Sequence, residues 1–107
     1  MKNKHNHTIE FAPFTLAEGV DEATLIAAAD DLQKEFLSRQ KGFIKRDLAR
    51  LTDGKWADVI YWESRESVEQ AMETAPENPA ALRYFQLMAT SESEVVNTLM
   101  RITRSYS

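Results

Sequence analysis

Residues 42–64, GFIKRDLARLTDGKWADVIYWES, constrain the fold of this chain more than any other segment. Asp53-Gly54 is a strong hairpin signal, because Gly adopts positive φ without steric cost and Asp tolerates it. Before the turn the side chains alternate, with Ile44 and Leu48 expected on one side of the strand and Phe43 on the other. The residues after the turn, 56–62, are rich in strand-forming types. We therefore expect two antiparallel strands joined by a tight turn.

A helical pattern precedes this hairpin. Asp21 is a suitable N-cap, because its carboxylate can accept hydrogen bonds from free amides of the first turn. Gly42 is expected to end the segment in the left-handed conformation. Apolar side chains recur at helical spacing and form one stripe: Leu25, Ala28, Ala29, Leu32 and Phe36.

A second helical pattern follows the hairpin. Ser64 can cap it, and Pro76 and Pro79 break it, with Pro79 suited to the first turn of a short third helix. The apolar stripe of the second helix is expected at Val68, Ala71, Met72 and Ala75. That of the third is expected at Ala81, Tyr84, Phe85 and Met88.

Strands are expected at both ends of the domain. Residues 7–14 and 94–104 alternate as strands do, whereas residues 1–6 are polar and are expected to form a poorly ordered tail. A chain of 107 residues is one domain. The order of elements is βαββαβ, which predicts an α+β, ferredoxin-like fold with an antiparallel sheet and both main helices on one face.

Such a sheet leaves its second face uncovered. Ile9 and Phe11 share one side of the first strand, and on the third strand Val59 and Tyr61 face opposite to the equally apolar residues beside them. Strands that are apolar on both faces need cover on both faces. A second copy of the sheet is the simplest cover, so we expect a homodimer.

Composition excludes several classes of protein. The net charge of −4 argues against a nucleic-acid binder, which would need a basic face. No window approaches the roughly 20 apolar residues of a membrane span, and the start of the chain lacks a signal-peptide pattern, so we expect a cytoplasmic protein. The chain has no Cys, and the His5-x-His7 pair offers too few ligands, so we expect no metal. His7 remains a candidate base, because it titrates near neutrality.

Arg46 and Asp58 are the first candidates for chemistry. Counted outward from the turn, Asp58 falls opposite Leu48 or Ala49, which leaves Arg46 a near-diagonal neighbour within reach. The two residues form either a structural ion pair or a site for a substrate anion in which Asp58 orients Arg46. Glu10 can join either arrangement.

Aromatic residues are the second group of candidates. Trp56 and Trp62 share a parity on one strand, and they either pack in the core or dimer interface or form a pocket wall that stacks on an aromatic ligand. The same two alternatives, packing in the core or interface and forming a pocket wall, apply to Tyr84 and Phe85 on the short third helix. Tyr61 carries a donor that needs a partner if it is buried.

A family resemblance rests on these same residues. Gly42-Phe43, Arg46, Leu48, Asp53-Gly54-Lys55-Trp56, Asp58 and Tyr61-Trp62-Glu63-Ser64 resemble the antibiotic biosynthesis monooxygenase-like families of the dimeric α+β barrel superfamily, over about residues 8–104. The resemblance implies a homodimer whose sheets face each other, with a pocket between sheet and helices in each subunit. In the cofactor-free oxygenases of this superfamily, polar and aromatic side chains bind a phenolic or polycyclic substrate as an anion, which itself reacts with oxygen.

The heme-degrading branch of the superfamily does not fit. Those relatives need an Asn on the first strand, a Trp in the second helix and a following His. This chain has Glu10 and Ala12, Ala71, and no His after His7. Two functions stay open: a cofactor-independent monooxygenase acting on a small aromatic or quinol compound, and a non-catalytic, small-molecule-binding or stress-related dimer.

Overall fold

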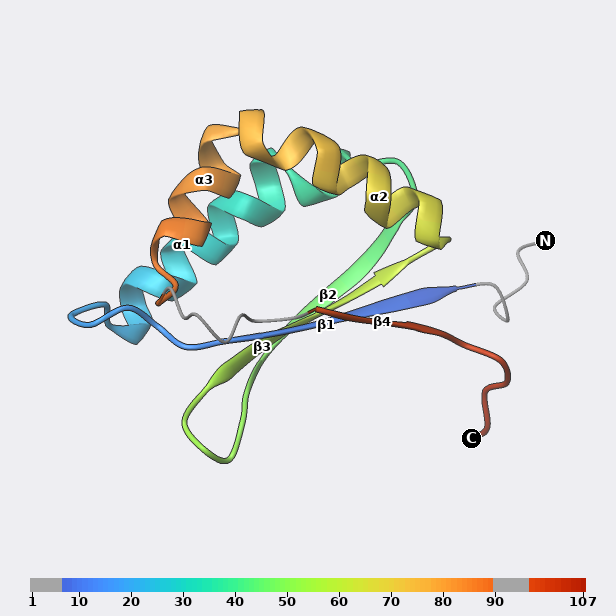
Figure 1. The fold of residues 1–107 in the computed structure, drawn as a ribbon, viewed down its shortest axis with the longest axis horizontal. Helices are drawn as coiled ribbons and strands as arrows, with labels where there is room; N and C mark the ends of the chain where they lie inside the picture. Colours follow the sequence, from blue (N-terminus) through green and yellow to red (C-terminus); the bar gives the residue numbers. More distant parts are fainter. Residues whose placement is uncertain (1–6, 90–96) are drawn as a thin grey trace.

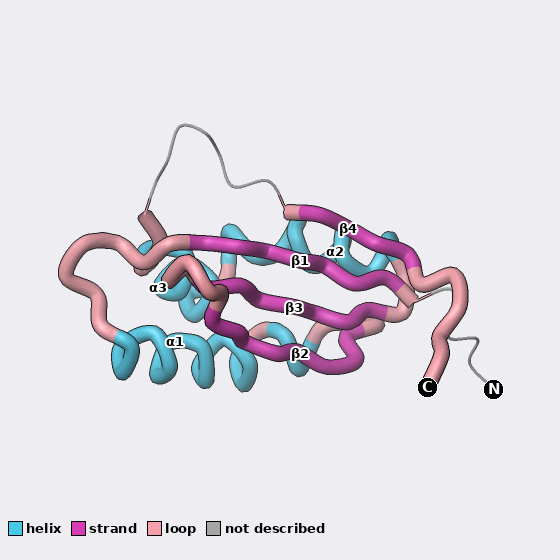
Figure 2. The backbone as a smooth tube through the Cα atoms, turned by 90° about the horizontal axis from the view of Figure 1, so that it is seen from below, coloured by secondary structure: helices cyan, strands magenta, loops and turns pink. Residues whose placement is uncertain are grey.

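Four strands form one antiparallel sheet, and all the α-helices of the described chain lie on the same face of it in this computed structural model (Figure 1). The structure describes residues 7–89 and 97–107. The strand order is β2-β3-β1-β4, so that β1 and β3 are central (Figure 2). The elements are β1 (Thr8–Phe14), α1 (Glu22–Glu35), β2 (Phe43–Arg50), β3 (Trp56–Trp62), α2 (Arg65–Thr74), α3 (Pro79–Gln86) and β4 (Thr98–Arg101), with short 3-10 turns η2 (Leu37–Arg39) and η3 (Ala75–Glu77). The predicted ferredoxin-like fold is confirmed.

Short polar side chains fix where the helices begin. Asp21 accepts a hydrogen bond from the Thr24 amide at 2.9 Å, and Ser64 accepts one from the amide of Ser67 at 3.2 Å, as predicted. Asn78 caps α3, which begins with a proline as expected. Each cap satisfies an amide that the helix itself leaves without a partner.

Gly42 adopts the predicted left-handed conformation, with φ of +87°, but it does not end α1. That helix stops at Glu35, and η2 intervenes before the strand begins. Gly42 instead lies at the entrance to β2, where its carbonyl accepts a hydrogen bond from the amide of Glu63 at 2.7 Å. The prediction of a helix C-cap was wrong because the chain makes one more tight turn before turning into the sheet.

The hairpin of β2 and β3 forms as predicted, with Leu48 directly opposite Asp58. A register shift between Phe43 and Lys45 alters the expected alternation at the start of β2. Phe43 packs against the core, as Leu48 does, and Ile44 is 40% exposed. A β-bulge of this kind inserts one residue and reverses the faces of the residues before it.

The two faces of the sheet have different environments. Trp56 and Trp62 lie in the core between sheet and helices. On the outer face of the sheet, no helix of the described chain packs over the strands (Figure 1). The apolar side chains there are half-buried or exposed: Ile9, Phe11, Val59, Tyr61 and Met100. This face is the apolar surface that the sequence predicted would need cover.

Two expectations fall partly on residues that the structure does not describe. The expected tail, residues 1–6, lies outside the described residues, as do residues 94–96 of the expected last strand. The described part of that strand is β4, which pairs antiparallel with β1. In the described ranges, no helix combines the length and apolar character that crossing a membrane requires.

Candidate functional site

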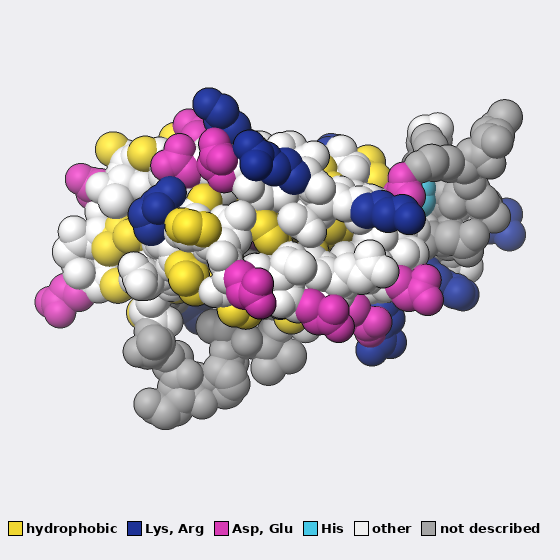
Figure 3. Space-filling model, turned by 90° about the horizontal axis from the view of Figure 1, so that it is seen from above, with side chains coloured by type: hydrophobic (Ala, Val, Ile, Leu, Met, Phe, Trp, Pro, Cys, Tyr) yellow, Lys and Arg dark blue, Asp and Glu magenta, His cyan; other side chains and the backbone are white. Residues whose placement is uncertain are grey.

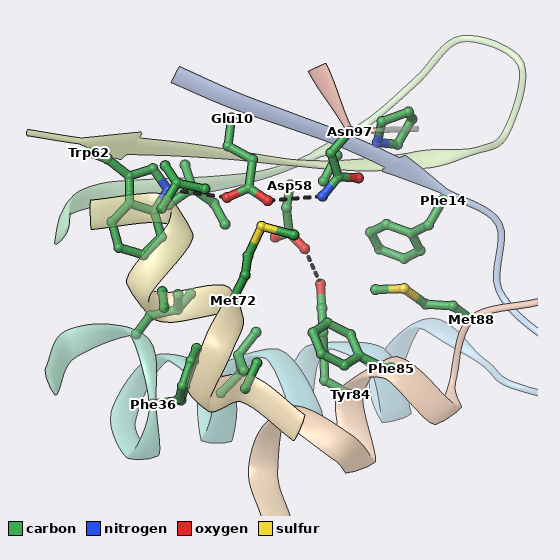
Figure 4. A pocket seen from close by; sticks show the side chains of 18 residues that line it. Glu10, Phe14, Phe36, Asp58, Trp62, Met72, Tyr84, Phe85, Met88 and Asn97 are labelled. Carbon is green, nitrogen blue, oxygen red and sulfur yellow. Dashed lines mark hydrogen bonds between the residues drawn. The ribbon is translucent and has the colours of Figure 1, made fainter. Parts of the chain in front are cut away.

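A cavity of about 340 Å³ lies between the sheet and the helices (Figure 4). This volume lies within the range of roughly 300–1,000 Å³ that is usual for small-molecule sites. Most of its walls are apolar, with a few polar groups on the sheet side. The lining residues are Glu10, Ala12, Pro13, Phe14, Leu32, Phe36, Leu37, Asp58, Ile60, Trp62, Val68, Ala71, Met72, Ala75, Tyr84, Phe85, Met88 and Asn97.

Glu10 is a buried carboxylic acid in the cavity wall. It projects from β1 toward the helices and is only 8% exposed. Its Oε1 accepts a hydrogen bond from Trp62 Nε1 at 3.1 Å, and its Oε2 accepts one from Asn97 Nδ2 at 2.9 Å. Burial raises the pKa of Glu10 above 4.5; the nearby charge of Asp58 raises it further, against the lowering effect of the two hydrogen bonds. A carboxylate so placed is a stronger base than one in water.

Asp58 is the second carboxylate of the cavity and has two direct partners. Its Oδ1 accepts from Arg46 Nε at 2.8 Å, and its Oδ2 accepts from the Tyr84 hydroxyl at 2.7 Å (Figure 4). Arg46 Nη1 also donates to the carbonyl of Ala29 at 2.9 Å, which ties β2 to α1. Burial and the Asp58 carboxylate raise the pKa of Tyr84, so its hydroxyl stays protonated as a donor.

The strand register brings these groups together. Asp58 and Trp62 are four positions apart on β3 and therefore point to the same face. Glu10 pairs with Ile60, which makes Trp62 its diagonal neighbour across the strands. Arg46 also pairs with Ile60, which places it one diagonal step from Asp58. The polar floor of the cavity thus follows from the pairing of β1, β3 and β2.

Part of the cavity wall is exposed to solvent. Met72 of α2 is 57% exposed and Phe85 of α3 is 48% exposed, although both line the cavity. They therefore form part of its opening. Met72 was expected in the buried stripe of α2, and it lies at the opening instead. The helix-covered face of the molecule carries apolar side chains among acidic and basic ones (Figure 3). An apolar ligand would meet an apolar entrance there.

The structure gathers most of the predicted site residues around one cavity. They come from β1, β3 and α3, so that elements far apart in the sequence meet at one place. The predicted residues that line the cavity are Glu10, Asp58, Trp62, Tyr84 and Phe85.

Four predicted residues do not line the cavity. Arg46 lies behind Asp58, with its guanidinium 5.2 Å from the Tyr84 ring. His7 lies just before β1, and its buried Nε2 has no hydrogen-bond partner within the described ranges. The pairing of Arg46 with Asp58 was predicted as one of two readings, and it forms as an ion pair.

The other two are aromatic residues of β3. Trp56 packs in the core near the far end of the strand, with the Arg50 guanidinium 5.1 Å from its ring. Tyr61 lies on the outer face, beneath Lys45 Nζ at 4.7 Å from its ring. Trp56 thus has the first of its two predicted positions, in the core, and Tyr61 faces away from the cavity.

Asn97 is the polar cavity residue that sequence reasoning missed. It precedes β4 and has the same parity as Leu99, which pairs with Glu10. Its parity was the available signal: side chains alternate along the expected strand over residues 94–104, which puts Asn97 on the same side as Leu99. Across the described residues, no three His, Cys, Asp or Glu side chains cluster as a metal ion would require.

Comparisons of the sequence with protein-family models and with curated proteins found no match. Solved structures do match. A variant of SnoaB, a cofactor-independent oxygenase from Streptomyces nogalater, has a TM-score of 0.73 and 17% identity over 94% of this chain and 96% of its own. A Bordetella bronchiseptica protein, provisionally described as an antibiotic biosynthesis monooxygenase, has a TM-score of 0.72 and 14% identity over 94% of this chain and 99% of its own.

A Caulobacter crescentus protein with the same provisional description has a TM-score of 0.66 and 12% identity over 95% of this chain and 92% of its own. All three likenesses span nearly the full length of both chains. At such low identity these likenesses support the fold and not the activity. This chain therefore has the ferredoxin-like α+β fold of SnoaB and of proteins described as antibiotic biosynthesis monooxygenases.

Proposed function

We propose that this chain is an antibiotic biosynthesis monooxygenase-like enzyme that oxidises a small aromatic or quinol compound without a cofactor. The observation that supports it most is Glu10, a buried carboxylate with a raised pKa in the wall of an otherwise largely apolar cavity. A perturbed carboxylate in such a pocket is a typical general base. SnoaB, which shares the fold, is a cofactor-independent oxygenase.

The chemistry proposed for Glu10 is proton removal from the substrate. Its carboxylate takes the proton of a phenolic hydroxyl, so the substrate O–H bond breaks and an O–H bond forms on Glu10. The resulting phenolate is electron-rich enough to react with molecular oxygen. In an anthrone, such a hydroxyl forms when the ring methylene passes one hydrogen to the carbonyl oxygen. The methylene carbon then loses both of its hydrogens, one of them by way of Glu10, and gains one oxygen atom of O2 as a carbonyl. The two hydrogens leave with the other oxygen atom as water. Trp62 and Asn97 hold the Glu10 carboxylate in place through their hydrogen bonds.

Replacing the proposed base should slow turnover sharply. We expect Glu10→Gln to lower kcat/KM for an anthrone by about a hundredfold or more, because general base catalysis contributes roughly that much. In the unmodified protein the rate should rise with pH through the pKa of Glu10, which lies above 4.5, because only the carboxylate accepts the proton. Oxygen consumption, corrected for spontaneous oxidation of the anthrone, measures both effects.

Glu69→Gln is the matched control for that experiment. Glu69 lies on α2, exposed, where it pairs with Arg65 and does not line the cavity. Its replacement removes the same charge and should leave the rate unchanged. If Glu10→Gln retained the full rate, Glu10 would not be the base. If aromatic compounds bound without any oxygen consumption above background, the protein would be a non-catalytic binding protein.

We further propose that the active form is a homodimer joined through the outer face of the sheet. Its apolar side chains have no cover within the described chain, and a second copy supplies a matching surface. We expect Phe11→Glu to convert the dimer to a monomer, because the interface would bury two new negative charges, one from each subunit. Sedimentation at micromolar concentration tests this.

The control for the dimer is Leu82→Glu. Leu82 is 42% exposed on α3, on the helix-covered side of the molecule, so its replacement should leave the dimer intact. A wild-type protein that sediments as a monomer under these conditions would refute the proposed interface.

A further inference from the structure

We propose that the cavity selects aromatic ligands that donate hydrogen bonds through neutral hydroxyl groups and rejects ligands that carry a carboxylate. This inference rests on the proposed function and narrows its substrate class. It follows from the charge and hydrogen-bonding state of the polar groups among the described lining residues: Glu10, Asp58, Tyr84, Asn97 and the Trp62 indole.

The charges in the cavity wall have one sign. Both ionisable acids there, Glu10 and Asp58, are carboxylates, and no Lys, Arg or His occurs among the described lining residues. Arg46, the cation that pairs with Asp58, has a side chain that is 6% exposed and does not line the cavity. Its guanidinium binds Asp58 and the Ala29 carbonyl, so its charge offsets that of Asp58. Ionised Glu10 therefore leaves the site with a net negative charge.

The donors in the cavity wall are already engaged. The Tyr84 hydroxyl donates its single hydrogen to Asp58, and the Trp62 indole donates its only hydrogen to Glu10. Asn97 donates one amide hydrogen to Glu10 as well. Each carboxylate oxygen keeps further lone pairs free to accept. The capacity that remains is therefore mainly that of an acceptor, and a ligand must bring the donors.

A ligand carboxylate would bind weakly in this environment. It would lose its hydration, meet oxygens of the same charge and find no cation among the described lining residues to pair with. A neutral phenol or quinol loses far less on entering, and its hydroxyl supplies the donor that Glu10 accepts. The same hydroxyl is the one that loses its proton in the proposed reaction.

Calorimetric titration with three stable probes tests this selectivity. The probes are naphthol, a hydroxynaphthoic acid with its two substituents on different rings, and the methyl ester of that acid. The ester has the size of the acid without its charge. At mildly alkaline pH we expect naphthol and the ester to bind and the acid to bind at least about tenfold more weakly than the ester.

Glu10→Gln should narrow the difference between acid and ester to a few-fold, while Glu69→Gln should leave it unchanged. The amide of a Gln at this position keeps an oxygen for Trp62, and the Asn97 amide can turn to match it. If that variant failed to fold, a titration of the wild-type protein at rising pH would serve instead, because the rejection of the acid should strengthen as Glu10 ionises.

The outcomes separate the two proposals. An acid that binds as tightly as its ester would overturn the selectivity and leave the proposed oxygenase standing. If none of the three probes bound, the proposed function would fail, and the selectivity with it. A preference for the ester that persisted unchanged in Glu10→Gln would also overturn the inference, because its cause would then lie elsewhere.

Discussion

Asp58→Ala is expected to destabilise the protein by about 3–5 kcal/mol, because it leaves a buried cation without its counter-charge. Arg46 and Asp58 are each only 6% exposed and lie 2.8 Å apart. The same substitution removes the acceptor of the buried Tyr84 hydroxyl, which adds a second cost. Since the free energy of unfolding of small domains is about 5–15 kcal/mol, this loss would be a large part of the stability. Urea unfolding followed by far-UV circular dichroism measures it.

Glu22→Ala supplies the comparison for Asp58. The Glu22 carboxylate pairs with Arg50 at 3.3 Å, but both side chains are about 60% exposed, at 61% and 59%. An exposed pair contributes about 0–1 kcal/mol. The loss of stability in Asp58→Asn should lie between those of Asp58→Ala and Glu22→Ala, because an amide oxygen can still accept a hydrogen bond from Tyr84. If Asp58→Ala cost no more than Glu22→Ala, the buried pair would not contribute as its burial implies.

Gly42→Ala should destabilise the protein by about 2–4 kcal/mol for two reasons that add. The residue has φ of +87°, which a side chain tolerates poorly. A Cβ at this position would also lie 2.6 Å from the Cβ of Ser67 and closer still to its hydroxyl, so the start of α2 would have to move. Thermal and urea unfolding both measure the loss.

Gly54→Ala separates the two causes. Gly54 has nearly the same φ, +89°, but an added Cβ there meets no heavy atom within 4 Å. Its replacement by Ala should lower the free energy of unfolding only through the unfavourable positive φ, by about 1–2 kcal/mol. Ser67→Gly in the Gly42→Ala background should recover part of the difference. Equal losses for Gly42→Ala and Gly54→Ala would mean that contact with α2 does not matter.

Local signals made much of the fold predictable. Counting outward from the turn at Asp53-Gly54 placed Asp58 opposite Leu48 or Ala49, with Arg46 within reach. In the structure Asp58 pairs with Leu48 and contacts Arg46. The caps at Asp21 and Ser64 were predictable because a capping side chain acts within three residues of itself. These features depend on neighbours along the chain or across one tight turn.

The orientation of the strands in the fold was not predictable in the same way. On β3, Ile60 and Trp62 alternate with Val59 and Tyr61, and both sets are apolar, so the pattern does not tell which face receives the helices. The helices pack over the face of the sheet that carries Trp56, Ile60 and Trp62, and this packing makes it the buried face. Trp62 lines the cavity and Trp56 does not, although Phe14, which pairs with Trp56, lines it too.

The polar floor of the cavity depended on contacts between distant segments. The hydrogen bond between Glu10 and Asn97 joins residues 87 positions apart, and the pairing of β1 with β4 brings them together. No local motif marks that pairing. The sequence offered Glu10 as a residue that could join Arg46 and Asp58, and its burial in the cavity wall beside Trp62 appears only in the fold.

Binding of an aromatic phenol in the cavity, the central claim, is tested most directly by NMR of the methionine methyl groups. Met72 and Met88 line the cavity, whereas Met100 lies on the outer face of the sheet. Single Met→Leu substitutions assign the signals. On titration with naphthol, we predict saturable shifts of the Met72 and Met88 signals with Met100 unchanged. Shifts confined to Met100, or no shift at saturating naphthol, would contradict the claim.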